Sequence, residues 1–84
     1  MLAQTPKNDK QILRLGMIAE LDVINLYEQL AENAKNNSVK KVLLDIAKEE
    51  KTHVAEFETL LLKLDKEQEQ ETEAGRKEVE KLTE

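Results

Sequence analysis

Two stretches of this chain repeat their apolar residues at alternating steps of four and three, and this period constrains the fold more than any other feature. Such spacing places the repeated residues on one face of a helix that packs against a partner. We therefore expect helices over 9–35 and 38–65, with Asn36, Asn37 and Ser38 as the turn between them. Because the turn is so short, the two helices should be antiparallel neighbours. Within it, an Asn can adopt the left-handed conformation that closes the first helix, and Ser38 can cap the second.

The composition agrees with a helical protein. Among 84 residues, aromatic side chains make up 2% and charged side chains 37%, with two Gly and one Pro. This composition is typical of long helices that form bundles and gives almost no support to β structure. Cysteine is absent, which excludes disulfides and thiolate metal sites. The net charge of −5 argues against nucleic acid as a partner. No apolar run approaches the roughly 18 residues of a membrane span, and the N-terminus lacks a secretory pattern, so we expect a soluble, cytoplasmic protein without membrane contact.

The segments outside the two long helices carry weaker signals. Thr5-Pro6 and Asn8-Asp9 are both able to start the first helix after a short N-terminal tail. The range 66–84 is predicted to be an acidic extension followed by a short C-terminal helix. Gly75 is expected to break the extension before the helical piece at 76–82.

Each long helix is apolar over more than one stripe. A two-helix hairpin can bury only one stripe per helix, so the remaining apolar side chains would face water. Self-association into a four-helix bundle is the simple solution, and we expect a homodimer or a larger homo-oligomer. Gly16 lies inside the first helix, where a single Gly more often marks close packing than a helix end. The predicted fold class is all-α: an antiparallel two-helix hairpin plus a short C-terminal helix, dimerising into a four-helix bundle.

Glu20, Glu50 and His53 each occupy a position on the repeated face where helix packing calls for a hydrophobic residue. An ionised carboxylate left unpaired there would cost several kcal/mol, so it needs a proton, a partner or a metal. Counted from the turn at about 1.5 Å per residue, Glu20 and His53 lie at nearly the same height, with Glu50 within one turn. Glu50 and His53 are three residues apart, which places both on one face of the second helix. The two carboxylates and the chain's only histidine are therefore predicted to face one another.

One carboxylate from the first helix and a Glu-x-x-His pair from the second form half of the ligand set of a carboxylate-bridged di-metal bundle. A symmetric pair of hairpins would complete the set, and its four glutamates would neutralise two divalent ions. Carboxylate-rich ligation with one His per metal suits iron or manganese better than tetrahedral zinc, although zinc stays open on affinity grounds. The alternative without a metal is an oligomerisation module, in which the polar core residues only set the register of the helices.

Tyr27 and Asp22 lie close to these residues in the sequence. Tyr27 follows Glu20 on the same stripe, two turns further on, as either a core aromatic residue or a hydrogen-bond partner of a ligand carboxylate. Asp22, Glu49 and Glu56 should point more toward solvent. They are expected to be surface residues, with guidance of ions toward the site as the alternative role.

The stretch 12–65, with Glu20, Tyr27 and the motif Glu50-x-x-His53, resembles encapsulated ferritins, the short ferritin-like proteins housed in encapsulin nanocompartments. The resemblance is strongest to the ferritin-like domains fused to some encapsulin shell proteins. It implies a ferroxidase in a ferritin-like four-helix bundle, with oxygen or peroxide as the oxidant. Glu20, Glu50 and His53 of two chains would be the catalytic ligands of two irons per dimer, with Tyr27 beside them. Such dimers commonly form a decameric ring, and the ferric product is stored as mineral inside the surrounding shell.

Two features depart from that family's pattern. Encapsulated ferritins often place acidic residues one before and two after the first ligand Glu, along the route by which iron reaches the site. Here these positions hold Ala19 and Asp22, so only one carboxylate is kept. Separate cargo proteins also end in a short targeting peptide, whereas this chain stops at Glu84 without one. We therefore expect either a domain of a shell fusion or a different means of recruitment.

A rubrerythrin-like peroxidase is the alternative enzyme with the same di-iron core. No rubredoxin-type cysteines are present, so such an enzyme would need an external electron donor.

Overall fold

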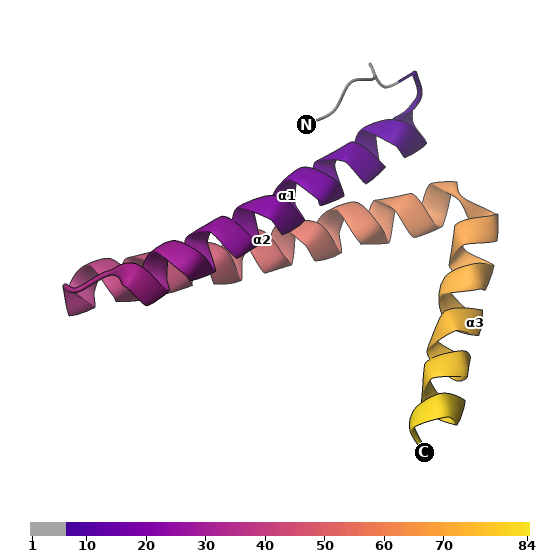
Figure 1. The fold of residues 1–84 in the computed structure, drawn as a ribbon. Coiled ribbons are helices and arrows are strands. Elements are labelled where there is room, and N and C mark those ends of the chain that lie inside the picture. The colour runs from indigo at the N-terminus through magenta and orange to yellow at the C-terminus, as the bar shows by residue number, and fades with distance from the viewer. Residues whose placement is uncertain (1–6) are drawn as a thin grey trace.

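The computed structural model describes residues 7–84, which form three α-helices. α1 (Asp9–Asn33) and α2 (Asn37–Leu64) make an antiparallel hairpin, and α3 (Lys66–Thr83) leaves the end of α2 at a steep angle (Figure 1). The described part of the chain contains no strand, and none of its helices is long and apolar enough to cross a membrane. The predicted all-α class and the antiparallel hairpin are confirmed, while dimerisation stays a prediction.

α1 begins at Asp9 because Asn8 caps its first turn. The Asn8 side-chain oxygen accepts a hydrogen bond from the backbone N–H of Gln11 at 2.9 Å, which satisfies one of the free donors at the helix N-terminus. Asp9 adds a negative charge beside the positive end of the helix dipole. Thr5-Pro6, the other predicted start, lies outside the described residues.

The turn between α1 and α2 differs from the prediction. α1 ends at Asn33, and Ala34 is extended, with φ −71° and ψ 134°. Asn36 caps α2, since its side-chain oxygen accepts hydrogen bonds from the backbone N–H groups of Ser38 and Val39 at 2.8 and 3.1 Å. No non-glycine residue in the described part of the chain has a positive φ. The prediction of a left-handed Asn and a Ser38 cap was wrong, because Ala34 and Asn36 are both extended and the Asn36 side chain supplies the cap.

The interface of α1 and α2 buries a small apolar core. Its buried members are Leu13, Ile24, Ala31, Ala47 and Leu61. Many large apolar side chains stay 45% to 84% exposed: Ile12, Ile18, Leu21, Leu26, Leu30, Val39, Val42, Leu44, Leu60, Leu64, Val79 and Leu82. One hairpin thus leaves many of its apolar side chains uncovered, and the self-association that would cover them stays a prediction.

Asp65 joins α2 to α3 and caps both helices. Its backbone N–H donates to the carbonyl of Leu61 at 2.9 Å, and its Oδ1 accepts from the backbone N–H of Gln68 at 3.0 Å. Arg14 on α1 donates from Nη2 to Oδ2 of Asp65 at 2.8 Å. The hydrogen bond from Gln68 lowers the pKa of Asp65, and the positive charges of Lys10 and Arg14 lower it further against the opposing effect of desolvation. Asp65 therefore ties the start of α3 to the hairpin through a charged contact.

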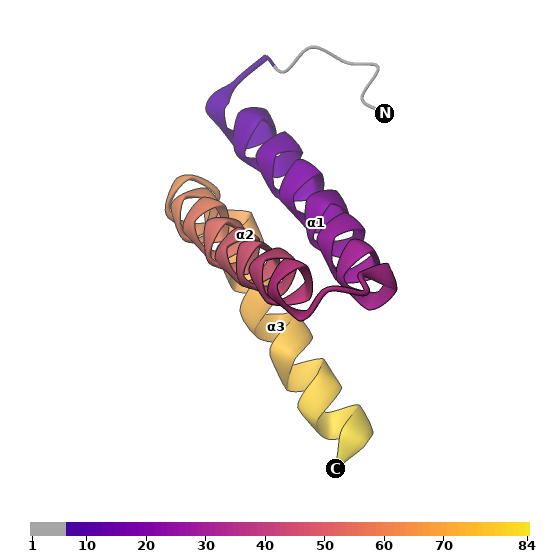
Figure 2. The ribbon, with the colours of Figure 1, turned by 90° about the vertical axis from the view of Figure 1, so that its left-hand side faces the viewer.

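α3 is one continuous helix, so the prediction that Gly75 breaks this segment was wrong. A single interior Gly costs about 1 kcal/mol relative to Ala. Side-chain contacts one turn apart support the helix: Gln68 contacts Thr72 before the glycine, and Arg76 contacts Glu73 across it. α3 buries none of its residues, and its backbone approaches α2 but not α1 (Figure 2). The long hairpin and this projecting helix together give a radius of gyration of 16.1 Å, against about 12 Å for a compact chain of this length.

Candidate metal centre

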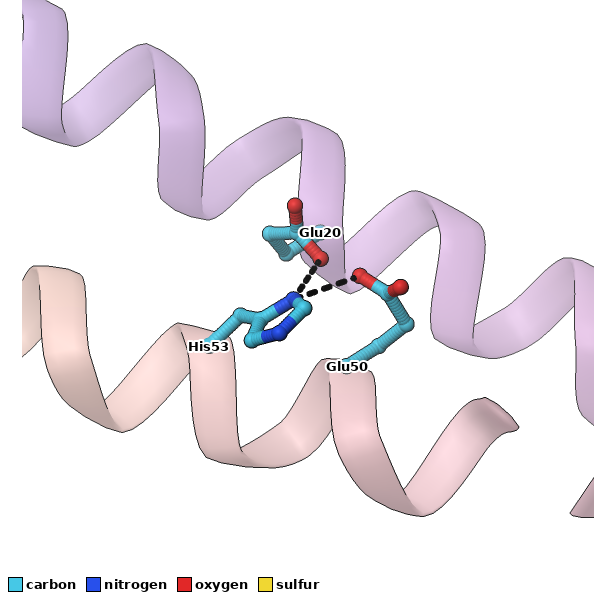
Figure 3. Close-up of side chains that lie close together, drawn as sticks. All are labelled: Glu20, Glu50 and His53. Atoms are coloured by element: carbon cyan, nitrogen blue, oxygen red, sulfur yellow. Dashed lines mark hydrogen bonds and ion pairs between the residues drawn. The ribbon is translucent and has the colours of Figure 1, made fainter. Parts of the chain in front are cut away.

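Glu20, Glu50 and His53 lie together between α1 and α2 (Figure 3). The Nδ1 atom of His53 is 3.3 Å from Oε2 of Glu50 and 3.5 Å from Oε2 of Glu20. Each residue offers one ligand atom, and these atoms all lie within 4.8 Å of one another. Separations of this size allow one ion to contact all three side chains.

Helix geometry explains this meeting. Glu50 and His53 are three residues apart on α2, so their side chains share a face. α1 runs antiparallel to α2, and Glu20 faces this pair across the interface (Figure 3). The sequence predicted that the three side chains point into the interface and lie at about the same height along the helices. The structure brings the three residues together. Their role as metal ligands stays a prediction.

The two carboxylates of this group are partly buried and have no Lys or Arg partner in the described part of the chain. The side chains of Glu20 and Glu50 are 23% and 18% exposed, and that of His53 is 46% exposed. Lys51, next to Glu50 in the sequence, pairs instead with Glu28 at 2.9 Å. With its hydrogen on Nδ1, His53 can donate to one carboxylate, and Glu50 is the closer. Oε2 of Glu20 is left buried without a hydrogen-bond partner.

These three residues fit an iron site. A buried carboxylate oxygen without a donor is costly, and a bound cation would satisfy it. Two carboxylates and one imidazole are a donor set suited to iron or manganese. Because His53 is nearly half exposed, the group is also open on one side, where ligands from a second copy could reach it.

Tyr27 and Asp22 do not belong to the group of ligand atoms. Tyr27 is half-buried on α1 and makes no hydrogen bond with another residue that the structure describes, so its place beside the ligands stays a prediction. Asp22 is exposed, as are Glu49 and Glu56, in agreement with their expected surface positions.

Two contacts beside the centre were not predicted from the sequence. Gly16 on α1 lies against the ring of Phe57 on α2, where a Cβ atom on Gly16 would come within 3.2 Å of the ring. The prediction that Gly16 marks close packing is confirmed, but its partner was not identified. The second contact is the ion pair of Arg14 with Asp65. The contact of Gly16 with Phe57 could have been found in the sequence, since each residue lies one turn from a candidate ligand. The ion pair has no such sequence signal.

Comparisons with known proteins place the chain in a family. Residues 11–84 match the family model described as rubrerythrin. A ferritin-like–encapsulin shell fusion protein of Pyrococcus furiosus is 58% identical over 73 residues, which cover 87% of this chain and 21% of that protein. An encapsulin nanocompartment cargo protein of Myxococcus xanthus is 41% identical over 56 residues, which cover 67% of this chain and 43% of that protein. The chain therefore spans less than half the length of either relative.

The crystal structure of the encapsulated ferritin domain from Pyrococcus furiosus matches this fold with a TM-score of 0.88 and 50% sequence identity. The match covers 99% of this chain and 88% of that chain. The predicted resemblance to encapsulated ferritins and the ferritin-like fold are confirmed. The chain belongs to the rubrerythrin family, whose ferritin-like fold implies iron binding.

Proposed function

We propose that this chain is a ferroxidase, which oxidises Fe(II) to Fe(III) at a di-iron centre formed between two copies. The observation that carries the proposal is Oε2 of Glu20, which is buried without a hydrogen-bond partner beside Glu50 and His53. Within the described residues, the only positive group near this oxygen is His53 when it is protonated, at 3.5 Å. A divalent cation would satisfy both carboxylates at once.

Each of the three side chains has a task in this proposal. Glu20 and Glu50 bind substrate Fe(II) through carboxylate oxygens, and His53 binds it through a ring nitrogen. Two copies supply four carboxylates, whose charge balances two divalent ions. The rigid helices hold these donors in place before the substrate arrives, which removes the cost of arranging them. Bound iron supplies the one-electron redox chemistry that reduces oxygen or peroxide.

A second copy is required because one hairpin offers only half of the site. The stripe of α2 that carries Glu50 and His53 continues to Leu60 and Leu64, and both are 51% exposed. A second hairpin laid on this stripe would bury these residues and bring its own ligands to the open side of the group. We infer a homodimer with two irons. By the resemblance to encapsulated ferritins, the complete oligomer would be a decameric ring.

The names of the relatives support a place for this activity. One is a fusion of a ferritin-like domain with an encapsulin shell, and the other is an encapsulin cargo protein. We propose that the chain works with an encapsulin shell protein, inside a nanocompartment in the cytoplasm, where the shell holds the ferric product as stored mineral. The exposed Asp22 is the candidate for guiding iron toward the centre.

Anaerobic loading with Fe(II), followed by metal analysis, tests the centre. We expect about one iron per chain in the wild type and much less in Glu50→Ala. Glu49→Ala is the matched control, because it removes an exposed carboxylate from the neighbouring position of α2. Oxygen should then oxidise the iron of the wild type and of this control, as followed by absorbance of the ferric product. Equal binding and oxidation by Glu50→Ala would overturn the proposal and leave the inward carboxylates as residues that set the helix register.

The family match favours a second candidate, a rubrerythrin-like peroxidase that uses the same residues. Because these 84 residues contain no cysteine, the electron donor for that reaction would lie outside them. Mixing the iron-loaded protein with oxygen or with hydrogen peroxide separates the two functions. Oxidation by oxygen followed by growth of a ferric mineral supports the ferroxidase, whereas turnover with peroxide alone supports the peroxidase.

A further inference from the structure

Gly16 and Phe57 meet one helical turn from the candidate metal centre. Gly16 precedes Glu20 by four residues on α1, and Phe57 follows His53 by four residues on α2. Because α1 and α2 are antiparallel, this contact lies on the side of the centre nearer to α3. A Cβ atom on Gly16 would lie 3.2 Å from two carbons of the Phe57 ring, Cε2 and Cζ. The ring therefore rests directly against the backbone of α1.

The small size of Gly16, and not its backbone freedom, is the property that matters at this position. Glycine weakens a helix interior relative to alanine. Gly16 does not have a positive φ, so the backbone conformation does not call for glycine. Gly75, the other glycine of the chain, would have no atom within 4 Å of an added Cβ. At Gly16, in contrast, the missing Cβ allows the aromatic ring to approach.

A small residue lies on the other side of the centre as well. Ala47 is about one turn before Glu50 on α2, and it is buried in the interface of the hairpin. The ligands therefore sit between two levels at which the helices can come close together. We propose that Gly16 and Phe57 position the metal ligands, because their contact sets the separation of α1 and α2 where Glu20 has to reach Glu50 and His53. This inference rests on the proposed function, since it treats the three side chains as ligands of one site.

The distances explain why the centre would be sensitive to this contact. Nonbonded carbon atoms favour separations of about 3.5–4.0 Å. A methyl group on Gly16 would therefore force the ring or the helix to move by a few tenths of an ångström. Metal–ligand distances tolerate deviations of only about 0.2 Å. A wider interface carries Glu20, which comes from α1, away from the two ligands on α2.

Gly16→Ala tests the inference, with Gly75→Ala as the matched control. Co(II), whose visible absorption reports its coordination, is titrated into the metal-free full chain, and thermal unfolding of the metal-free protein is measured alongside. We expect Gly16→Ala to bind Co(II) on the order of tenfold more weakly. The unfolding temperature should change little, because the higher helix propensity of alanine offsets the cost of the tighter contact with Phe57. Gly75→Ala should bind Co(II) as the wild type does. A substitution that acted only on the fold would not lower the affinity for Co(II) while the unfolding temperature is kept.

A second substitution keeps the test decisive if Gly16→Ala disturbs folding. In Gly16→Ala/Phe57→Leu, the smaller side chain makes room for the added methyl group, and most of the lost affinity should return. Unchanged affinity in Gly16→Ala, or no recovery in the double variant, would overturn the inference. Equal Co(II) binding by the wild type and Glu50→Ala would instead show that the proposed function has failed, and the inference would fall with it.

Discussion

Glu20→Gln is expected to stabilise the metal-free protein while it weakens metal binding. In the wild type, Oε2 of Glu20 is buried without a donor, and the side chain is 23% exposed. A buried polar group left unsatisfied costs about 1–3 kcal/mol. Glutamine keeps the shape, removes the charge and can donate a hydrogen bond to Glu50. We expect the free energy of unfolding to rise by about 1–2 kcal/mol. This is the lower part of the range of about 1–3 kcal/mol, because Glu20 is partly exposed.

Thermal unfolding at one protein concentration, with and without Co(II), measures this effect. A change of about 1 kcal/mol corresponds to about 4–8 °C in Tm for a domain of this size. Metal at a hundredfold excess over its Kd should stabilise the wild type by about 2.7 kcal/mol and the variant far less. The order of the two Tm values should therefore reverse when metal is added. Glu32→Gln, which changes an exposed carboxylate on the same helix, should shift the stability by no more than about 0.5 kcal/mol.

A Glu20→Gln protein that is less stable than the wild type without metal would refute this reasoning. Such a result would mean that Oε2 of Glu20 is already satisfied in the metal-free protein. Protonated His53, at 3.5 Å, is the partner that the structure offers for that role. Equal stability in both conditions would show that the carboxylate neither destabilises the fold nor binds the metal.

Other substitutions test the remaining contacts. Leu60→Glu should lower the oligomer mass measured by light scattering, because it places a charge on the exposed apolar stripe. Thr59→Glu adds the same charge at an exposed polar neighbour and should leave the oligomer mass unchanged. Because the pKa of Asp65 is lowered in the folded protein, its ion pair with Arg14 should contribute fully above the ordinary Asp value of 3.8. That contribution should be lost as the pH falls from this value through the lower pKa of the folded protein. Distances between spin labels on α1 and α3 should then change with acid in the wild type, and Asp65→Asn should lack this transition. Gly75→Ala should stabilise α3 by up to about 1 kcal/mol, seen as a stronger helical circular dichroism signal, and a weaker signal would contradict its open surroundings.

The hairpin and the meeting of Glu20, Glu50 and His53 were predictable because helix geometry is regular. A period of 3.6 residues places Glu50 and His53 on one face of α2 and Glu20 on the side of α1 that meets it, and matched counts from the turn place all three at one level. Errors of one or two residues at helix ends do not disturb this result. The first helix, for example, ends at Asn33 rather than at residue 35.

Caps and close contacts were harder to predict because each depends on competing options. Asn36 and Ser38 are both good capping residues, and the backbone angles that decide between them are not visible in the residue types. The break at Gly75 was wrong because the cost of one glycine has to be compared with the helix contacts around it. The pair of Arg14 and Asp65 joins residues 51 positions apart, and no local pattern signals such a contact.

The three residues proposed as half of a metal site share one face of this hairpin with an uncovered apolar stripe, and in the proposed dimer metal binding and association should be linked energetically. In a centre shared by two copies, metal binding strengthens association, and association strengthens metal binding by the same factor. Without metal, the inward carboxylates of two copies would face one another, and their like charges would oppose the burial of Leu60 and Leu64. In the proposed dimer, the apolar stripe would therefore draw the copies together, and the cation would remove the repulsion that keeps them apart. A centre confined to one hairpin would show no such coupling, so the dependence of association on Co(II) distinguishes a shared site from a site within a single chain.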